Sequence, residues 1–228
     1  MAGRARTVAV MQPYFFPYAG YFRLMAVTDH FVVFDCVQFP RRGWVHRCRV
    51  PSPVGGEEWL TLPLEPCPRD TRIMDLRFAA GAGAALAARL KRYPWLASGK
   101  GAAADALRQH LASPLDDVTS FLLDGLKLVS AALRVAPEIT RSSALGLAPE
   151  LRGQERVIAA ARAVGATCYV NASGGRQLYD SRVFAEHGME LRFLSSYTGV
   201  YPHMLHALAH TTPDEIRADV LAQCELVP

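Results

Sequence analysis

The side chains best suited to chemistry gather in two segments near the N-terminus. In the first, residues 11–18, Pro13 and Pro17 restrict the backbone. This restriction is expected to hold the amide of Gln12 and the phenol of Tyr14 in place for hydrogen bonding to a polar ligand. The alternative is that the aromatic side chains of this segment only cap the core.

The second segment, residues 35–49, offers an acid, a thiol and a base. Asp35 ends an apolar run, so it is either a general base or ligand-orienting carboxylate, or the cap of a nearby turn. Cys36 is a candidate nucleophile toward a thioester, with His46 as the base that forms its thiolate. Gln38 is expected to face the same site as a substrate-binding residue.

A cationic and aromatic cluster follows in the same segment. Its members are Arg41, Arg42, Trp44, His46, Arg47 and Arg49. Such a cluster suits the phosphate of a nucleotide sugar or of a phosphopantetheine arm, and Arg47 and Trp44 are the expected binders. The alternative is a solvated edge that resists strand pairing.

Later polar positions add weaker candidates. Ser142 and Ser143 follow a short apolar run and are expected to donate hydrogen bonds to a phosphate. Ser173 and Gly174 form a loop of small residues that lets backbone approach a ligand, with Tyr179 pointing back toward it. The histidines at 203, 206 and 210 share a helical spacing without a carboxylate or cysteine partner, so no metal site is predicted.

The elements around these residues predict an α/β fold with a Rossmann-like, mostly parallel sheet. Residues 7–11 and 30–35 are apolar runs typical of buried strands, and residues 19–27 suit a short helix between them. Ligands bind beyond the carboxyl ends of such strands. The sequence therefore predicts one pocket that contains residues 11–18 and 35–49.

The remaining chain predicts one domain over residues 1–228 with two insertions. Residues 44–50, 58–64 and 72–78 have strand composition and predict a β-flap. Residues 79–133 predict about three helices, with Ser113 as an N-cap before Pro114. A strand before residue 140, a helix at 153–164, a strand at 167–171, a helix through residue 184 and a strand at 189–194 complete the sheet.

Composition narrows the class of protein. A formal charge of +4 over 228 residues is too small for a nucleic-acid footprint, and the five scattered cysteines predict reduced thiols. No apolar run is long enough to insert into a membrane, and the first ten residues do not read as a signal peptide. A cytoplasmic protein is expected.

Six short motifs resemble the WbqC-like protein family. They are MQPYFFPYAGYF at 11–22, DCVQF at 35–39, GWVHR at 43–47, WLTLPL at 59–64, RSS at 141–143 and NASGGRQLYD at 171–180. Members commonly carry a second acid where this chain has Cys36. The resemblance implies a role in surface-polysaccharide or natural-product biosynthesis, attaching acyl or aminoacyl groups to amino sugars or amines.

A weaker resemblance points to adenylate-forming and nucleotidyl-transferring α/β proteins such as pantothenate synthetase. It rests on Val10-Met11, residues 37–39 and residues 141–143 in that order, whereas Pro17 or Tyr18 and Tyr21 occupy the places of the histidine pair. Those histidines stabilise charge on the phosphates during adenylyl transfer. An ATP-dependent amide ligase or nucleotidyltransferase is therefore the second hypothesis.

The leading hypothesis is a small acyl or aminoacyl transferase acting on a small-molecule amine. Its donor is a CoA or acyl-carrier-protein thioester, and no tightly bound cofactor is expected. Asp35 or His46 removes the amine proton, Gln12 and Tyr14 orient the acceptor or stabilise the oxyanion, and Arg47 binds a phosphate. A non-catalytic scaffold of a biosynthetic complex is the third hypothesis.

Overall fold

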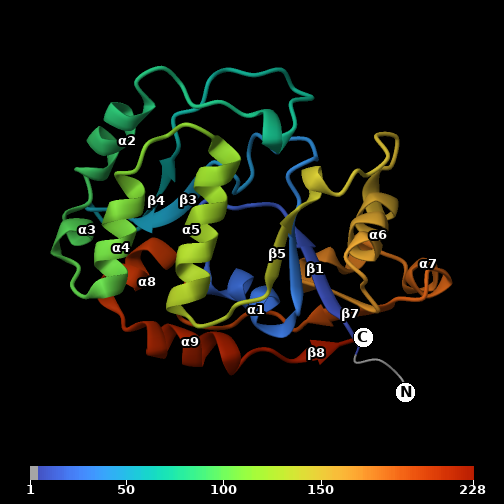
Figure 1. Ribbon diagram of the computed structural model, residues 1–228. Helices are drawn as coiled ribbons and strands as arrows, with labels where there is room; N and C mark the ends of the chain where they lie inside the picture. Colours follow the sequence, from blue (N-terminus) through green and yellow to red (C-terminus); the bar gives the residue numbers. More distant parts are fainter. Residues whose placement is uncertain (1–4) are drawn as a thin grey trace.

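The computed structural model, which describes residues 5–228, is built on a six-stranded sheet with the order β5-β2-β1-β6-β7-β8 (Figure 1). The strands are β1 Thr7–Met11, β2 His30–Val33, β5 Glu138–Arg141, β6 Cys168–Asn171, β7 Glu190–Leu194 and β8 Leu226–Val227. All neighbouring pairs are parallel except β7 and β8. The predicted mostly parallel α/β fold is confirmed.

Alternation along the central strands fills a core on each face of the sheet. Val8 and Val10 of β1 pack with Val157 and Ile158 of helix α6 (Gly153–Ala163). Ala9 points the other way, into the core that contains the buried residues of helix α1 (Ala19–Val27). Because both faces are covered, the strands are apolar at nearly every position.

Helices cover the two faces unequally. Helices α6 and α7 (Ser181–Glu186) lie on one side of the sheet in Figure 1, whereas α1 and α5 (Val118–Ala132) lie on the other. The larger core on the α1 side also includes helices α8 (Met204–His210) and α9 (Pro213–Leu221). No helix within residues 5–228 has the length and apolarity needed to cross a membrane.

The predicted β-flap is a two-stranded hairpin. Strands β3 (Arg47–Pro51) and β4 (Glu57–Thr61) pair antiparallel, which confirms the first two strands of the prediction with shorter bounds. The third, at 72–78, is wrong: it contains the 3-10 helix η1 (Ile73–Asp75) between two isolated bridges, at Arg72 and at Phe78. An ion pair three residues apart, Arg72 to Asp75, favours the helical turn over an extended strand.

The helical insertion contains four helices rather than three. They are α2 Ala82–Leu90, α3 Pro94–Ser98, α4 Ala102–Leu111 and α5 Val118–Ala132. The N-cap predicted at Ser113 is wrong, because its hydroxyl donates to the carbonyl of His110 at the end of α4. Asp117 caps α5 instead by accepting from the backbone N–H of Ser120 at 2.7 Å.

The C-terminal helices and β8 were not predicted, and a buried cation ties them to the sheet layer. Arg23 of α1 is 1% exposed. Its guanidinium donates to the carbonyl of Ser195 at 2.9 Å and to that of Gln223 at 2.7 Å. Burial of this charge is compensated by backbone acceptors, so the tail is anchored by a polar contact that a hydropathy pattern does not reveal.

Candidate functional site

A cavity of about 770 Å³ opens at the carboxyl ends of β1, β2 and β5. We call it the strand-end cavity. The polar side chains that line it include Gln12, Cys36, Gln38, Asp70, Arg152 and Arg156. Its size and its position at strand carboxyl ends are typical of small-molecule sites in open α/β sheets.

Asp35 forms the floor behind this cavity. Its carboxylate is fully buried and accepts four hydrogen bonds, two on each oxygen. The donors are the Arg141 Nε at 2.7 Å, the Ser142 hydroxyl at 2.9 Å, and the backbone N–H and hydroxyl of Ser143 at 2.9 and 2.7 Å. The geometry favours the capping interpretation of Asp35, because this carboxylate joins the end of β2 to the end of β5.

Ser142 and Ser143 therefore bond to the buried floor and also line the cavity. The Ser142 hydroxyl also accepts from the backbone N–H groups of Asp35 and Cys36, at 3.1 and 3.2 Å. With its proton donated to Asp35, this hydroxyl is fully engaged. Ser143 keeps only acceptor capacity toward a ligand. Donation of hydrogen bonds from this pair to a phosphate therefore stays a prediction, and the geometry does not favour it.

Arg156 connects the thiol of Cys36 to the first turn of α6. Its guanidinium donates to the Cys36 sulfur at 3.3 Å and to the carbonyls of Leu151 and Pro149 at 2.7 and 2.8 Å. Arg156 is 9% exposed, whereas Arg152 at the N-cap position is exposed and makes no side-chain hydrogen bond to the first turn of α6. Two cations thus lie beside uncapped helical N–H groups.

Gln38 holds the outer wall of the strand-end cavity. Its amide donates to the carbonyl of Arg69 at 2.6 Å, and its backbone pairs with that of Arg72 in an isolated bridge. The neighbouring N–H of Phe39 donates to the carbonyl of Thr71 at 2.8 Å. These bonds place the exposed Asp70 in the lining of the cavity.

Gln12 lines the cavity, but Tyr14 is outside the lining. The hydroxyl of Tyr21 donates to the carbonyl of Gln12 at 2.8 Å, which holds the loop after β1. Tyr14 packs on the ring of Tyr21 with centroids 5.4 Å apart. Burial, and to a lesser extent the nearby Tyr18, raise the pKa of Tyr14. This phenol is therefore a neutral packing group whose direct role in chemistry stays a prediction.

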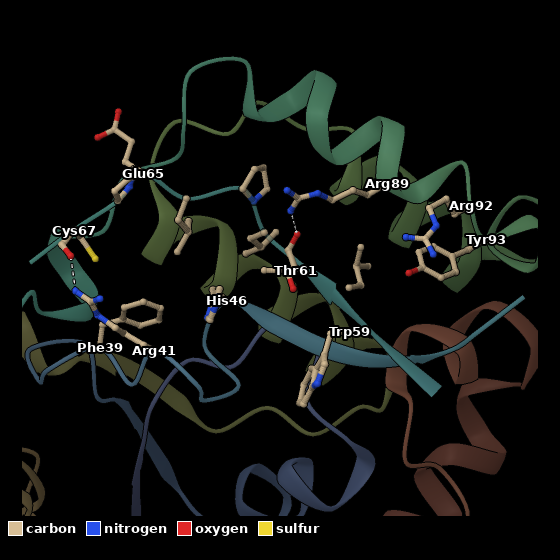
Figure 2. A pocket seen from close by; sticks show the side chains of 15 residues that line it. Phe39, Arg41, His46, Trp59, Thr61, Glu65, Cys67, Arg89, Arg92 and Tyr93 are labelled. Carbon is tan, nitrogen blue, oxygen red and sulfur yellow. Dashed lines mark hydrogen bonds between the residues drawn. The ribbon is translucent and has the colours of Figure 1, made fainter. Parts of the chain in front are cut away.

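The single pocket expected from the sequence is wrong. His46 lines a second cavity, on the β-hairpin, together with Trp59 and Arg41 (Figure 2). Phe39, with 7% of its surface exposed, belongs to that second lining, whereas Gln38 belongs to the first. Because successive residues of this extended segment face opposite sides, it separates the two cavities. Cys36 and His46 consequently do not form a nucleophile and base pair.

The remaining hairpin candidates pack against one another. Trp44 meets Trp59 edge to face at 5.0 Å, and the Arg47 guanidinium lies 4.1 Å from the Trp59 ring centre. Arg47 also donates to the carbonyls of Arg42 and Gly43. These contacts give Arg47 a role in holding the loop before β3, and phosphate binding by Arg47 or Trp44 stays a prediction.

The loop after β6 lies outside both cavity linings. Ser173 and Gly174 begin the 3-10 helix η3 (Ser173–Leu178), and Tyr179 packs on the rings of Tyr169 and Phe184 in the α6-side core. A Cβ at Gly175 would lie 2.6 Å from the amide nitrogen of Asn171. The small residues of this loop therefore fit a close turn over a buried asparagine.

Comparison with known proteins places the chain in a family. The model of the WbqC-like protein family matches residues 12–210. The chain belongs to the WbqC-like protein family. A curated relative, "Uncharacterized protein Rv1507c" of Mycobacterium tuberculosis, is 35% identical over 60 residues, which are 26% of this chain and 26% of that protein. No solved structure matches the chain.

In this WbqC-like chain, the sequence analysis missed the four charged residues that line the strand-end cavity: Asp70, Arg72, Arg152 and Arg156. The spacing of Arg152 and Arg156, four residues apart at the start of the helix expected at 153–164, is a signal that could have found them. Asp70 has no such signal, because its place depends on the long-range contact of Gln38 with Arg69.

The histidines near the C-terminus pack with aromatic and acidic partners. His206 and His210 have ring centres 4.7 Å apart and both contact Trp95, while His203 bonds to Glu57 at 2.8 Å. Within residues 5–228, no group of three or more His, Cys, Asp or Glu side chains is arranged to hold a metal ion.

Proposed function

We propose that this chain transfers an acyl or aminoacyl group from a CoA or carrier-protein thioester to an amine, with the donor in the strand-end cavity. The observation that carries the proposal is the pairing of Arg152 with Arg156 beside the uncapped start of α6, at the carboxyl ends of three adjacent strands. Guanidinium groups and helical N–H groups are the donors that phosphate oxygens prefer.

The phosphate-bearing arm of the donor lies against Arg152 and the first turn of α6. The volume of about 770 Å³ accommodates this arm and a small acyl group. Gln12, whose backbone is held by Tyr21, donates its amide N–H to the thioester oxygen as negative charge develops there.

The proton of the attacking amine goes to Asp70. Asp35 is engaged by four donors and His46 lines the other cavity, so neither group is placed for this role. The amine nitrogen attacks the carbonyl carbon, the carbon–sulfur bond breaks, and the departing thiolate takes the proton that Asp70 received from the amine, which gives the free thiol and restores the carboxylate. The products are an amide and the thiol of the donor, and no ATP is consumed.

Calorimetric titration of the full chain with acetyl-CoA, magnesium ATP and a nucleotide sugar tests the proposal. Acetyl-CoA is expected to bind the unaltered chain. Arg152→Gln is expected to weaken this binding about tenfold, because it removes a guanidinium that contacts the phosphate. Arg152 is exposed, so the change should not disturb the core. Arg134→Gln is the matched control, since Arg134 pairs with Asp214 away from the cavity.

Activity separates the three hypotheses. Transfer from acetyl-CoA to a panel of amino sugars, read as free thiol released, should depend on Asp70 and fall at least tenfold in Asp70→Asn. Binding of ATP alone, with release of phosphate or pyrophosphate, would replace the transferase by the ligase. Neither binding nor turnover would leave the scaffold hypothesis in its place.

A further inference from the structure

The second cavity is a groove on the β-hairpin with a volume of about 650 Å³. One wall is a continuous segment, residues 59–67, which begins in β4, and the other carries Arg89 near the end of α2 and Arg92 just after it (Figure 2). We call it the hairpin groove. Nine consecutive residues along one wall make the site long rather than round, since an extended chain rises about 3.3 Å per residue.

At Trp59 and Thr61, the backbone edge of β4 that faces the groove pairs with no other strand within residues 5–228. Leu62 N–H donates to the carbonyl of His46, and Ser52 N–H to that of Gly56, which sets the hydrogen-bonded positions of the hairpin. Because bonded and non-bonded pairs alternate in an antiparallel ladder, Trp59 and Thr61 turn their backbone groups away from β3. The carbonyl of Thr61 accepts from the Arg89 side chain.

The same edge already accepts an extended segment farther along. Ala79 N–H donates to the carbonyl of Pro63 at 2.9 Å, and Glu65 N–H to the carbonyl of Arg77 at 3.0 Å. Residues 77–79 then turn away into α2. An added strand at Trp59 and Thr61 would continue this line of pairing, and edge strands of this kind are templates for strand addition.

The charge along the groove is mainly positive. Arg41 lies at one end, Arg92 at the other and Arg89 between them (Figure 2). The acidic side chain in the lining is Glu65, at the same end as Arg41, and Arg92 pairs with Glu58 at 3.1 Å. Cations spread along a groove match a chain that carries several separated negative charges, whereas a single phosphate needs them to converge.

His46 adds a neutral polar group to the floor of the groove. Its Nδ1 is buried and has no hydrogen-bond partner within residues 5–228. Burial, and then the charge of Arg47, lower the pKa of His46. An unpaired buried nitrogen is costly, so a bound polar group that reaches it gains affinity.

We propose that the hairpin groove binds an extended acidic peptide segment of a partner protein, by strand addition to the open edge of β4. The backbone of Trp59 and Thr61 supplies the pairing, and the arginines bind acidic side chains on alternate residues of the peptide. The groove shares no lining residue with the strand-end cavity, so this proposal stands independently of the proposed transferase activity.

Fluorescence anisotropy tests it with the full chain and a labelled nonapeptide of alternating glutamate and valine. The peptide is expected to bind, and Arg92→Gln to weaken binding at least tenfold, while Arg134→Gln leaves binding unchanged. Methylation of alternate backbone nitrogens of the peptide keeps its charge and should abolish binding, because those nitrogens can no longer pair with β4.

A second variant tests the edge itself. The N–H of Thr61 faces the groove, so Thr61→Pro removes it without breaking a bond to β3. Loss of peptide binding with an unchanged circular dichroism spectrum is the expected result.

Equal binding of the methylated peptide would identify a general polyanion surface and overturn the proposal. No binding by any acidic peptide, or self-association of the chain through this edge in sedimentation, would overturn it too.

Discussion

The two cavities lie on opposite sides of one segment, residues 37–39, yet they are built by different means. The strand-end cavity has a buried polar floor in which the carboxylate of Asp35 accepts from Arg141 and Ser142, while Arg156 donates to the Cys36 sulfur and nearby backbone. The hairpin groove is walled by arginines that each reach a single carbonyl or carboxylate. One region is held by shared, buried bonds and the other by separate contacts near solvent.

This difference suggests a division of labour. A buried floor whose carboxylate accepts four hydrogen bonds keeps the groups above it in fixed positions, as chemistry requires. Arginines with single, partly exposed contacts can exchange them for contacts with a partner at small cost. Rigid and adaptable surfaces therefore lie within one small fold, and substitutions in each should differ in their effect on stability.

The largest effect is expected for Asp35→Ala. The change leaves the donors of Arg141, Ser142 and Ser143 without their acceptor, at a position that is fully buried. Loss of one partner of a buried charged network costs about 3–5 kcal/mol. Urea denaturation followed by circular dichroism measures this loss in the free energy of unfolding.

An exposed ion pair is the control for that experiment. Asp75 bonds to Arg72 on the surface, with 43% and 53% of their side chains exposed. Asp75→Ala should cost less than about 1 kcal/mol, as is usual for surface pairs. Similar losses in the free energy of unfolding for the two variants would mean that the Asp35 network stabilises the fold no more than a surface ion pair does.

The next largest effect is expected at Gly20. A Cβ there would lie 2.2 Å from the Tyr18 ring and 2.7 Å from the Tyr197 ring, between the 11–18 loop and the C-terminal tail. Gly20→Ala should destabilise the fold by about 1–3 kcal/mol through overpacking. Gly83, in the groove wall α2, has no atom within 4 Å of such a Cβ, so Gly83→Ala should stabilise by about 0.5–1 kcal/mol. Equal signs for the two would contradict the contrast in packing.

A smaller effect is expected for Arg89→Ala in the groove. It removes the bond to the carbonyl of Thr61, which then faces water rather than a buried void. The expected loss is about 0.5–1.5 kcal/mol, the usual net value of one hydrogen bond. A loss as large as that of Asp35→Ala, in the same urea titration, would show that the groove is as tightly built as the strand-end cavity.

Sequence reasoning succeeded where burial alone decides structure. β1, β2 and β6 were found because they are apolar runs buried on both faces, as at Val8 and Val32, whereas β7 was found although Glu190 on it is exposed. The helix at 153–164 was found because its apolar spacing fits one face of α6. These elements carry their own pattern, so no distant contact was needed to predict them.

Sequence reasoning failed where a distant partner decides the outcome. Residues 72–78 have strand composition but lack a continuous partner, and Ser113 has cap chemistry but donates backward to His110. Two cavities are present where one pocket was predicted, because Phe39 and Gln38 face opposite sides of one segment. Gln12, Gln38 and the serine pair line the strand-end cavity. Gln12 and the serines follow the ends of β1 and β5, as strand order predicts, whereas Gln38 is held there by Arg69 and Arg72.

The smallest effect on stability is expected from protonation of His110, whose ring links the helical layer to the 11–18 loop. It stacks on Phe121 at 4.4 Å and meets the Phe16 ring edge at 5.7 Å. Burial lowers its pKa from the ordinary value of 6.5, against a weaker opposing influence of Asp124. The unfolded chain therefore takes up this proton at a higher pH than the folded chain does.

The stability contributed by neutral His110 should be complete above about pH 6.5 and decline as the pH falls below that value. Phe in its place cannot be protonated, so His110→Phe should lose less stability than the unaltered chain between neutral and mildly acidic pH. His30, His46 and His206 have pKa values lowered in the same direction, so the difference between the two profiles isolates His110.

Parallel profiles in urea titrations across this range, or a titration of the His110 ring by NMR above its ordinary value, would contradict the assignment. Because the ring joins α4 to the loop that carries Gln12, acid should loosen the contact between the helical layer and the strand-end cavity before it unfolds either.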